Sequence, residues 1–357
     1  MAEELSSIER TRRTLAQQAP DRAPVEMHNF MVTARLMGTT DYAAFFQDGE
    51  AMAEGQIKAW RRFGHDVLCL ENGTAALAQA CGVEVIYQQS SAPVAKQPAI
   101  QSLDEVERLK VPDPYSDPIL SELLMATRLV AREVGEQAFI IGRGDQGPFS
   151  LACEIRGMEQ FMMDLAMGEQ PEKIAHLLEY CLEVSRIYCL AQIEAGAHAT
   201  SIGDSPSGPD LLSPRMYRKW AYPYVKRLAA DLKAKDVILS YHICGNATPI
   251  IADMVSVFSE TPGSAPGILE IDQKADMSVC KQAARGKATL LGTVDPSEVL
   301  AQGTPELVLE KARIVIETLG PGGGFILGPG CALPATTPDE NLDALVEAAK
   351  RYPYPSA

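Results

Sequence analysis

The sequence predicts a (β/α)8 barrel. Three observations predict this fold: short β-rich runs recur along the chain, amphipathic helical stretches separate them, and there are eight such runs. Strict alternation of strands and helices is typical of a parallel sheet that is covered by helices. The expected strands are 24–27, 66–70, 138–142, 199–204, 236–242, 267–272, 288–292 and 324–328.

The stretches between these runs have apolar residues at helical spacing. Residues 304–319 show the pattern clearly, because Thr304 is a suitable N-cap and Pro305 suits the first helical turn. The stretches 171–195 and 214–234 have the same periodicity. We therefore expect a helix at each of these three places.

The whole chain, residues 1–357, fits one domain, with residues 1–20 as an N-terminal helical extension. A doubly wound open sheet is the rival fold, but no Gly-x-Gly-x-x-Gly segment follows the first strand. We see no internal repeat and no low-complexity linker. Residues 84–87 are expected to add a hairpin outside the barrel, ahead of the proline-rich loop 93–114.

Composition excludes several classes of function. The chain has 357 residues and a net charge of −15, which disfavours binding to nucleic acid or to an anionic membrane. It has no unbroken apolar run of about 18 residues and no apolar segment near its start, so we expect neither a membrane span nor a secretory signal. The eight cysteines are scattered, which is typical of reduced thiols. These features predict a cytoplasmic protein, with homo-oligomerisation left open.

The strongest chemical signal is a set of three soft ligands at strand ends. His242 and Cys244 end the fifth expected strand, and Cys331 follows the eighth. Positions i and i+2 of a strand point to the same side, and the chemistry of these barrels lies where strands end. Zinc accepts imidazole and thiolate ligands, and three protein ligands leave one position open for catalysis. The spacing alone leaves open that these are ordinary buried thiols.

These segments carry a family resemblance. The chain resembles the uroporphyrinogen decarboxylase superfamily, and within it the zinc-dependent, corrinoid-linked methyltransferases, such as the coenzyme M methyltransferases of methanogens. The most specific segments are His-Ile-Cys-Gly-Asn at 242–246 and Gly-Pro-Gly-Cys at 328–331. The resemblance implies a (β/α)8 barrel and zinc ligands at His242, Cys244 and Cys331. Other matching segments are 21–25, 147–150, 207–214, 292–296 and 337–341.

Departures from the family pattern bear on the branch and on the substrate. Decarboxylases carry Met-Arg-Gln-Ala-Gly-Arg after the first strand, whereas Met27 is followed here by His-Asn-Phe-Met, and Arg35 is the nearest cation. The decarboxylases also work without a metal, so this chain resembles the methyltransferase branch more closely. Thiol-directed methyltransferases usually have Asp-Pro-Thr-Ala-Ser where this chain has Asp-Ser-Pro-Ser-Gly at 204–208, and Gly-Asn at 292–293 where it has Gly-Thr. These changes leave the small substrate open.

The resemblance implies transfer of a methyl group between a small substrate and the cobalt of a corrinoid. Zinc can lower the pKa of a substrate thiol, or act as a Lewis acid on an ether oxygen. No Asp-x-His-x-x-Gly segment is present, so the corrinoid is expected on a separate corrinoid protein, or free. The methionine-rich stretch 155–167 is a candidate cover for the barrel mouth where that protein would dock.

The expected donor is an aryl methyl ether, as in an O-demethylase. This expectation rests on the altered loops and on the lack of a basic cluster that would bind a sulfonate. A coenzyme M-like thiol methyltransferase and, with less support, a uroporphyrinogen decarboxylase are the alternatives, and a non-catalytic partner that binds zinc or a corrinoid is a third.

Further polar residues near strand ends are candidates for catalysis or substrate binding. A nearby acid could protonate a phenolate leaving group, while Glu270 is a candidate fourth metal ligand that the spacing does not support. Each carboxylate has a helix cap or a loop position as its structural alternative, and an asparagine just past a strand is also an ordinary turn residue. The candidates are Glu71 and Asp204 for catalysis and His28, Asp145 and Asn246 for substrate binding.

Overall fold

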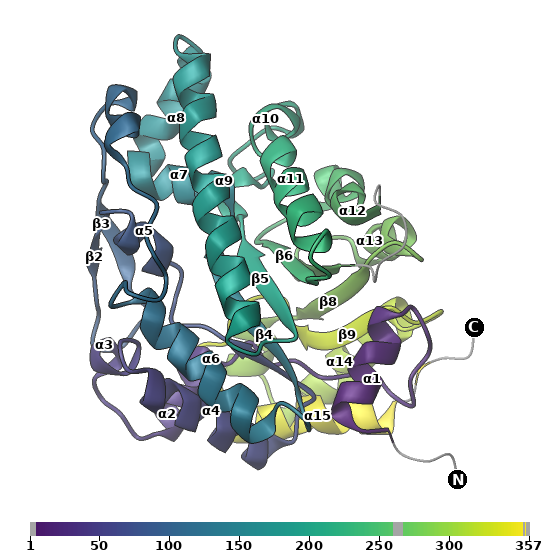
Figure 1. Ribbon diagram of the computed structural model, residues 1–357. Coiled ribbons are helices and arrows are strands. Elements are labelled where there is room, and N and C mark those ends of the chain that lie inside the picture. The colour runs from purple at the N-terminus through teal and green to yellow at the C-terminus, as the bar shows by residue number, and fades with distance from the viewer. Residues whose placement is uncertain (1–4, 260–266, 353, 355–357) are drawn as a thin grey trace.

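A curled, parallel sheet of seven strands lies at the centre of the protein, with helices around it (Figure 1). The computed structural model describes residues 5–259, 267–352 and 354. The strands follow one another in the sheet in chain order. They are β1 (Val67–Leu70), β4 (Phe139–Gln146), β5 (Ala199–Gly203), β6 (Leu239–Ile243), β7 (Ile268–Ile271), β8 (Thr289–Val294) and β9 (Phe325–Pro329).

The first of the eight expected strands, 24–27, is not a regular strand. Val25 forms a single bridge to Leu327 of β9, and Glu26 forms one to Val67 of β1. Strands β1 and β9 are the two edges of the sheet, so this segment lies between them. Its pairing is short because Pro24 has no N–H to donate and because the chain turns at His28, where φ is +42°. The expectation of eight regular strands is corrected to seven strands and a bridging segment.

Helices cover the outside of the sheet and account for most of the remaining chain. The longer ones are α1 (Ser7–Leu15), α4 (Gly49–Phe63), α6 (Leu120–Val134), α7 (Pro148–Arg156), α8 (Met158–Met167), α9 (Pro171–Glu194), α11 (Tyr222–Lys233), α12 (Ile251–Ser259), α13 (Met277–Ala284), α14 (Pro305–Leu319) and α15 (Asp339–Arg351). The shorter ones are α2 (Phe30–Leu36), α3 (Tyr42–Phe45), α5 (Ala76–Ala80), α10 (Pro214–Trp220), η1 (Leu103–Arg108), η2 (Ser205–Ser207), η3 (Thr248–Ile250) and η4 (Pro296–Ala301). A two-stranded hairpin of β2 (Glu84–Ile86) and β3 (Val94–Gln97) lies outside the main sheet.

The local sequence accounts for where these helices begin and end. Helix α14 has the predicted cap, since the Thr304 hydroxyl accepts the Leu307 N–H. Helix α9 is also confirmed, but the helix expected over 214–234 is divided at Ala221 into α10 and α11. Pro223 explains the division, because inside a continuous helix it would lack an N–H and clash with the preceding turn. The predicted hairpin is present, but its second strand occupies part of the expected loop 93–114.

The inner face of the sheet has two layers of side chains. Gly142 and Gly144 face helix α9, because an added Cβ at these positions would meet Gln192 and Cys189 of that helix. Their neighbour Arg143 must therefore face inward, since side chains alternate along a strand. Apolar side chains fill the layer nearer the amino ends of the strands: Val67, Cys69, Phe139, Ile141, Ala199, Ile268, Leu291 and Ile326, joined by Leu15 of α1.

Helix α1 closes the amino end of the sheet. Beneath it lies Asp66, which is fully buried and accepts hydrogen bonds from Ser7, Arg10 and Arg22, the Arg10 and Arg22 guanidinium groups each approaching to 2.7 Å. The Val25 N–H also donates to Asp66, at 2.9 Å. The predicted N-terminal helix thus ties the start of the chain to β1 through a buried carboxylate whose oxygens are well satisfied.

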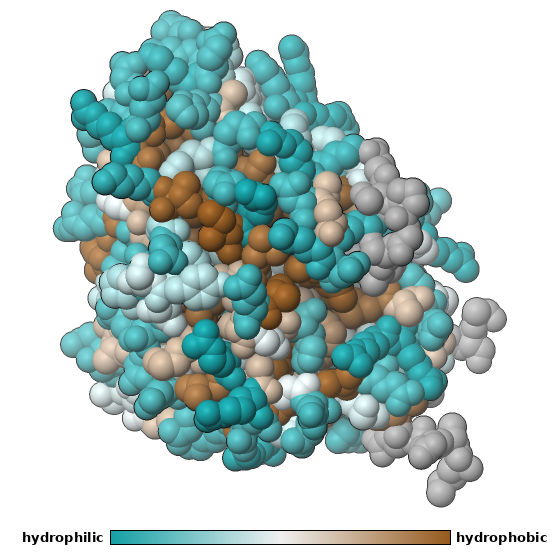
Figure 2. Space-filling view, in the orientation of Figure 1, coloured by the Kyte–Doolittle hydropathy of each residue, from teal (hydrophilic) through white to brown (hydrophobic). Residues whose placement is uncertain are grey.

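The face seen in Figure 2 is mainly hydrophilic, with apolar patches that gather across its middle. None of the helices in the described part of the chain is long and apolar enough to cross a membrane. The main apolar core lies between the sheet and its helices.

Candidate metal centre and the polar layer beside it

Three predicted metal ligands meet beyond the carboxyl ends of the strands. His242 lies near the end of β6, Cys244 follows that strand, and Cys331 follows β9. The His242 Nε2 lies 2.9 Å from the Cys244 Sγ, which lies 3.6 Å from the Cys331 Sγ. Zinc bonds to two sulfurs at about 2.3 Å with tetrahedral angles, which places the sulfurs about 3.8 Å apart. The sulfur pair fits that requirement, and the imidazole needs only a small outward shift.

The remaining contacts of this cluster suit a metal ligand set with one open side. The His242 Nδ1 lies 3.1 Å from the carbonyl oxygen of Glu270. A carbonyl only accepts hydrogen bonds, so Nδ1 donates to it, and Nε2 is the ring nitrogen that faces the sulfurs and would bind a metal. His242 is buried, whereas Cys244 and Cys331 are half-buried and are reached from outside.

A hydrogen bond between the two sulfurs separates the pKa values of Cys244 and Cys331. The Cys331 thiol donates a hydrogen bond to the Cys244 sulfur. This contact and the nearby His242 lower the pKa of Cys244 to about 3, although burial opposes the shift. The same contact raises the pKa of Cys331. Burial lowers the pKa of His242, but Glu270 and Cys244 raise it to about 9. One thiolate is therefore present at neutral pH, which is the form that binds metals.

A layer of buried charged side chains lies beside these ligands, on the inner face of the sheet. The imidazole of His28 joins two carboxylates: its Nε2 lies 2.8 Å from Glu71 Oε2 and its Nδ1 lies 3.0 Å from Glu270 Oε1. Arg143 approaches the same oxygen of Glu71, with 3.5 Å between the Arg143 Nε and Oε2. Glu26 accepts the backbone N–H of His28 with one oxygen, and its other oxygen has no partner among the described residues.

The charges of this layer are close to balance. Burial opposes ionisation of Glu71 and Glu270, but Arg143 and His28 lower the pKa of Glu71, and His242 and His28 lower that of Glu270 to about 2. Burial disfavours the charged form of His28, yet the two carboxylates raise its pKa well above the ordinary value. Burial raises the pKa of Glu26 to about 8. At neutral pH the carboxylates of Glu71 and Glu270 therefore face the cations of Arg143 and His28, with His242 also beside Glu270, and Glu26 is largely protonated.

A second cluster of residues whose side chains are able to bind a metal lies in this layer. Donor atoms of His28, Cys69 and Glu71 come within 4.8 Å of one another. However, His28 and Glu71 already bind each other, and the Arg143 cation stands beside Glu71. Burial also raises the pKa of the Cys69 thiol to about 12. This group is better described as part of the charged layer than as a metal site.

The structure separates the two predicted catalytic carboxylates. Glu71 lies in the charged layer, whereas Asp204 lies at the start of α7, where its Oδ1 accepts the Ser150 N–H at 2.7 Å. Asp145 has a similar position, since its Oδ2 accepts the Leu77 N–H of α5 at 2.8 Å. Both have an unpartnered second oxygen among the described residues, and burial raises the pKa of each to about 7. Their contacts are those of helix-capping residues.

The predicted substrate-binding residues His28 and Asn246 also lie in different surroundings. His28 lies in the charged layer, next to Glu270 and Glu71. Asn246 is exposed, and its side-chain oxygen accepts the Thr248 N–H at 3.2 Å. That contact is the turn geometry expected of an asparagine just past a strand.

Sequence reasoning missed Arg143 and Glu26 as members of this layer. The expected third strand ended at residue 142, but β4 continues to Gln146 and carries Arg143 to the inner face. The available signal was in the sequence itself, where Arg143 stands between two glycines directly after an apolar run. Only the packing of Gly142 and Gly144 against α9 shows that the Arg143 side chain faces the inside of the sheet.

The methionine-rich stretch 155–167 is helical in two pieces that meet at Gly157, where φ is +85°. Helix α8 projects at the top of the molecule in Figure 1. Its Phe161 is fully buried, while Met158, Met163 and Met167 are 41%, 52% and 66% exposed. One part of this stretch is therefore core, and three methionines face solvent.

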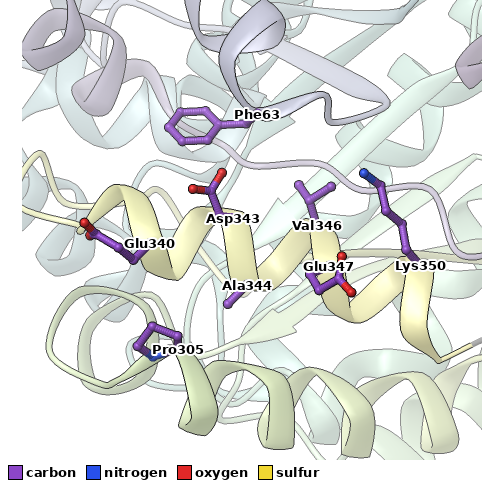
Figure 3. Close-up of a pocket in the computed structure, with 8 residues that line it drawn as sticks. All are labelled: Phe63, Pro305, Glu340, Asp343, Ala344, Val346, Glu347 and Lys350. Atoms are coloured by element: carbon purple, nitrogen blue, oxygen red, sulfur yellow. The ribbon is translucent and has the colours of Figure 1, made fainter.

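A surface groove lies away from all these residues. It has a volume of about 500 Å3 and lies between the end of α4, the start of α14 and one face of α15 (Figure 3). The side chains that line it are drawn in Figure 3, and they include none of the predicted site residues.

Comparison with known proteins identifies the family. A family model described as uroporphyrinogen decarboxylase (URO-D) matches residues 6–352. The methylcobamide:CoM methyltransferase MtbA of Methanosarcina acetivorans is 30% identical over 360 residues, covering 98% of this chain and 99% of the relative. A uroporphyrinogen decarboxylase of Coxiella burnetii is 26% identical, covering 95% and 94%.

A solved structure agrees with the observed architecture. The methyltransferase from Methanosarcina mazei matches with a TM-score of 0.85 and 24% identity, covering 98% of this chain and 99% of that one. At this identity the likeness shows the fold alone. The family model covers nearly the whole chain, and the chain therefore belongs to the uroporphyrinogen decarboxylase (URO-D) family.

Proposed function

We propose that this protein is a zinc-dependent methyltransferase, which moves a methyl group between a small substrate and the cobalt of a separate corrinoid protein. The observation that carries the proposal is the cluster of His242, Cys244 and Cys331, whose donor atoms lie within 4.8 Å of one another and whose sulfurs are half-buried. Relatives named methylcobamide:CoM methyltransferases cover 85% to 98% of the chain and support the same reaction class.

The three residues would hold the metal, and the rest of the chain would hold them in place. When bound, zinc would supply Lewis acidity toward a substrate thiol or ether oxygen. The carbonyl oxygen of Glu270 fixes the His242 ring by accepting a hydrogen bond from its Nδ1–H. Serine 205 contributes as well, since the Cys244 N–H donates to the Ser205 hydroxyl at 3.1 Å and fixes the turn that carries the thiol. These contacts keep the donors in place before substrate arrives.

The charged layer gives His28 a distinct role. Both of its ring nitrogens face carboxylates within 3.0 Å, so each carries a proton and the ring is an imidazolium. We propose that His28 is the proton-bearing group of the site and that Glu71 positions it. Glu71 is itself ionised by Arg143 and His28, so it is a poor proton donor at neutral pH. The catalytic role predicted for Asp204 stays a prediction, because its observed contact is to α7.

The identity of the small substrate is the more specific part of the proposal. An aryl methyl ether is retained as the first candidate on the basis of the altered segments 204–208 and 292–293. A coenzyme M-like thiol is the second candidate, and the names of the relatives favour it. The buried Arg143 bears on one premise of the aryl ether argument, namely that the chain lacks a basic cluster that would bind a sulfonate.

A porphyrinogen decarboxylase is the alternative that the family name raises. Proteins with that name match at 26% identity. Against this alternative, the segment after residue 27 lacks the arginine pair of the decarboxylases, and decarboxylases of the family have no use for the three clustered ligands.

A donor screen on purified protein tests the proposal. The zinc content is measured first, and the protein is then mixed with cob(I)alamin and either methoxyarenes or methyl thioethers, with methylation followed by the absorbance of the corrinoid. The reverse reaction uses methylcobalamin and 2-mercaptoethanesulfonate. We expect one equivalent of zinc and turnover with at least one substrate class. Metal-free protein with full activity on a porphyrinogen would refute the proposal.

A further inference from the structure

Arg143 is a buried cation whose donors are largely unused. Its side chain is 4% exposed, and its closest described carboxylate contact is the 3.5 Å approach of Nε to Glu71. Neither Nε nor Nη1 has a hydrogen-bond partner among the described residues. A guanidinium has five N–H donors, and leaving them unpaired away from water is costly. A ligand that accepts hydrogen bonds at this place would remove that cost.

The guanidinium lies beside Gly203, on the strand next to the one that carries His242. An added Cβ on Gly203 of β5 would lie 2.7 Å from the Arg143 Nη2, so the missing side chain leaves the space that the guanidinium occupies. Gly203 is paired with His242 on the next strand, β6. Neighbouring strands are about 4.8 Å apart, so the guanidinium lies about one strand away from the His242 imidazole on the same inner face.

A second unpartnered group lies beside Arg143. Ser201 of β5 is paired in register with Arg143, and it is buried. Its hydroxyl has no hydrogen-bond partner among the described residues. Two adjacent strands thus present unused polar groups at the same level of the inner face, next to the strand that carries His242.

We propose that Arg143, with Ser201, binds an anionic oxygen group of the small substrate while the reacting end of that substrate meets His242, Cys244 and Cys331. The substrate class is therefore a small methyl donor or acceptor that carries a carboxylate or a sulfonate. A planar guanidinium donates two parallel hydrogen bonds to such a group, which lysine or a neutral donor does not. This inference rests on the proposed function, because it names the substrate class of the same site.

Calorimetric titration of the zinc-loaded protein with matched probes tests the inference. The carboxylate pair is 4-methoxybenzoate and its neutral counterpart 4-methoxybenzamide, and the sulfonate pair is 2-mercaptoethanesulfonate and neutral 2-mercaptoethanol. We expect the wild type to bind at least one anion about tenfold or more tightly than its neutral counterpart. The pair that shows the preference identifies the anion as a carboxylate or a sulfonate.

Variants then assign that preference to Arg143. Arg143→Gln should weaken anion binding about 10- to 100-fold and leave the neutral probes within about twofold. Gly203→Ala keeps the charge but places a Cβ in the space of the guanidinium, so it should also reduce the preference. Arg35→Gln is the matched control, because Arg35 pairs with Asp339 and should not affect any probe.

Two outcomes would overturn the inference. One is a wild type that binds anionic and neutral probes equally or binds no anion. The other is a preference that survives in both Arg143→Gln and Gly203→Ala. Failure of the proposed function is separate, because it would appear as anion binding that depends on Arg143 without methyl transfer to or from cobalamin.

Discussion

The two ends of the central sheet treat buried charge in opposite ways. At the amino end, Asp66 is surrounded by donors from Ser7, Arg10, Arg22 and Val25. At the carboxyl end, Arg143 and other buried groups keep donors and acceptors without partners among the described residues. In barrels of this kind the amino end is associated with stability and the carboxyl end with chemistry. Within the described part of the chain, unpaired polar atoms also occur at the amino end, at His65 and at the Arg22 Nε, but the buried carboxylate there is fully satisfied. The unpaired donors of Arg143 are the ones that we propose are available for a ligand.

Removal of the metal ligands should have the largest effect on activity. We expect Cys244→Ala and Cys331→Ala to lose zinc, measured by elemental analysis, and to lower methyl transfer at least about 100-fold, because a site with one thiolate holds zinc weakly. The melting temperature should fall by only a few degrees, since the packing of the amino end is unchanged. Wild-type rates in both variants would disprove the metal assignment.

Removal of the buried carboxylate at the amino end should have the opposite effect, with a large loss of stability and little change in activity. Asp66→Asn leaves Arg10 and Arg22 with no full counter-charge in the interior. We expect a loss of about 3–5 kcal/mol in the free energy of unfolding, measured by urea denaturation. The methyl-transfer rate per folded molecule should stay within about twofold. A large fall in that rate without loss of stability would mean that the two ends are not distinct in function.

A histidine at the amino end should make stability depend on pH. Burial lowers the pKa of His65 to about 4, and neither ring nitrogen has a partner among the described residues. An unfolded histidine titrates near 6.5, so between these values the unfolded chain binds the extra proton and stability falls as the pH falls. The contribution reaches about 3 kcal/mol at pH 4.

The variant His65→Phe isolates this contribution. Its free energy of unfolding should decline less than that of the wild type between pH 6.5 and pH 4, as measured by urea denaturation at each pH. Parallel curves for the two proteins would show that His65 titrates normally in the folded state.

The smallest effect is expected at Asp204. The variant Asp204→Asn keeps an oxygen that can accept the Ser150 N–H, so we expect a stability change of at most about 1 kcal/mol. The methyl-transfer rate should change less than about threefold. A fall of 100-fold or more would instead support the catalytic role that the sequence predicted, and would extend the reactive end of the sheet outward to α7.

Much of the fold was predictable because its signals are local. Helical periodicity and the Thr304 cap lie within one stretch of sequence, and β1, β5, β7 and β9 lie within two residues of the predicted runs. The segment 24–27 was less predictable, since its pairing depends on two strands that are far away in the chain. The division at Ala221 was missed because the proline signal was outweighed by continuous amphipathic spacing.

The sequence by itself determined the alternation of strands and helices and placed His242, Cys244 and Cys331 at strand ends. Those features depend on local periodicity and on the types of ligand atoms. Only the tertiary structure decided which polar residues share an environment, because register across β4, β5 and β6 sets which side chains face each other. The pairing of β1 with β4 likewise places Arg143 beside Glu71, while Asp204 lies at a helix end.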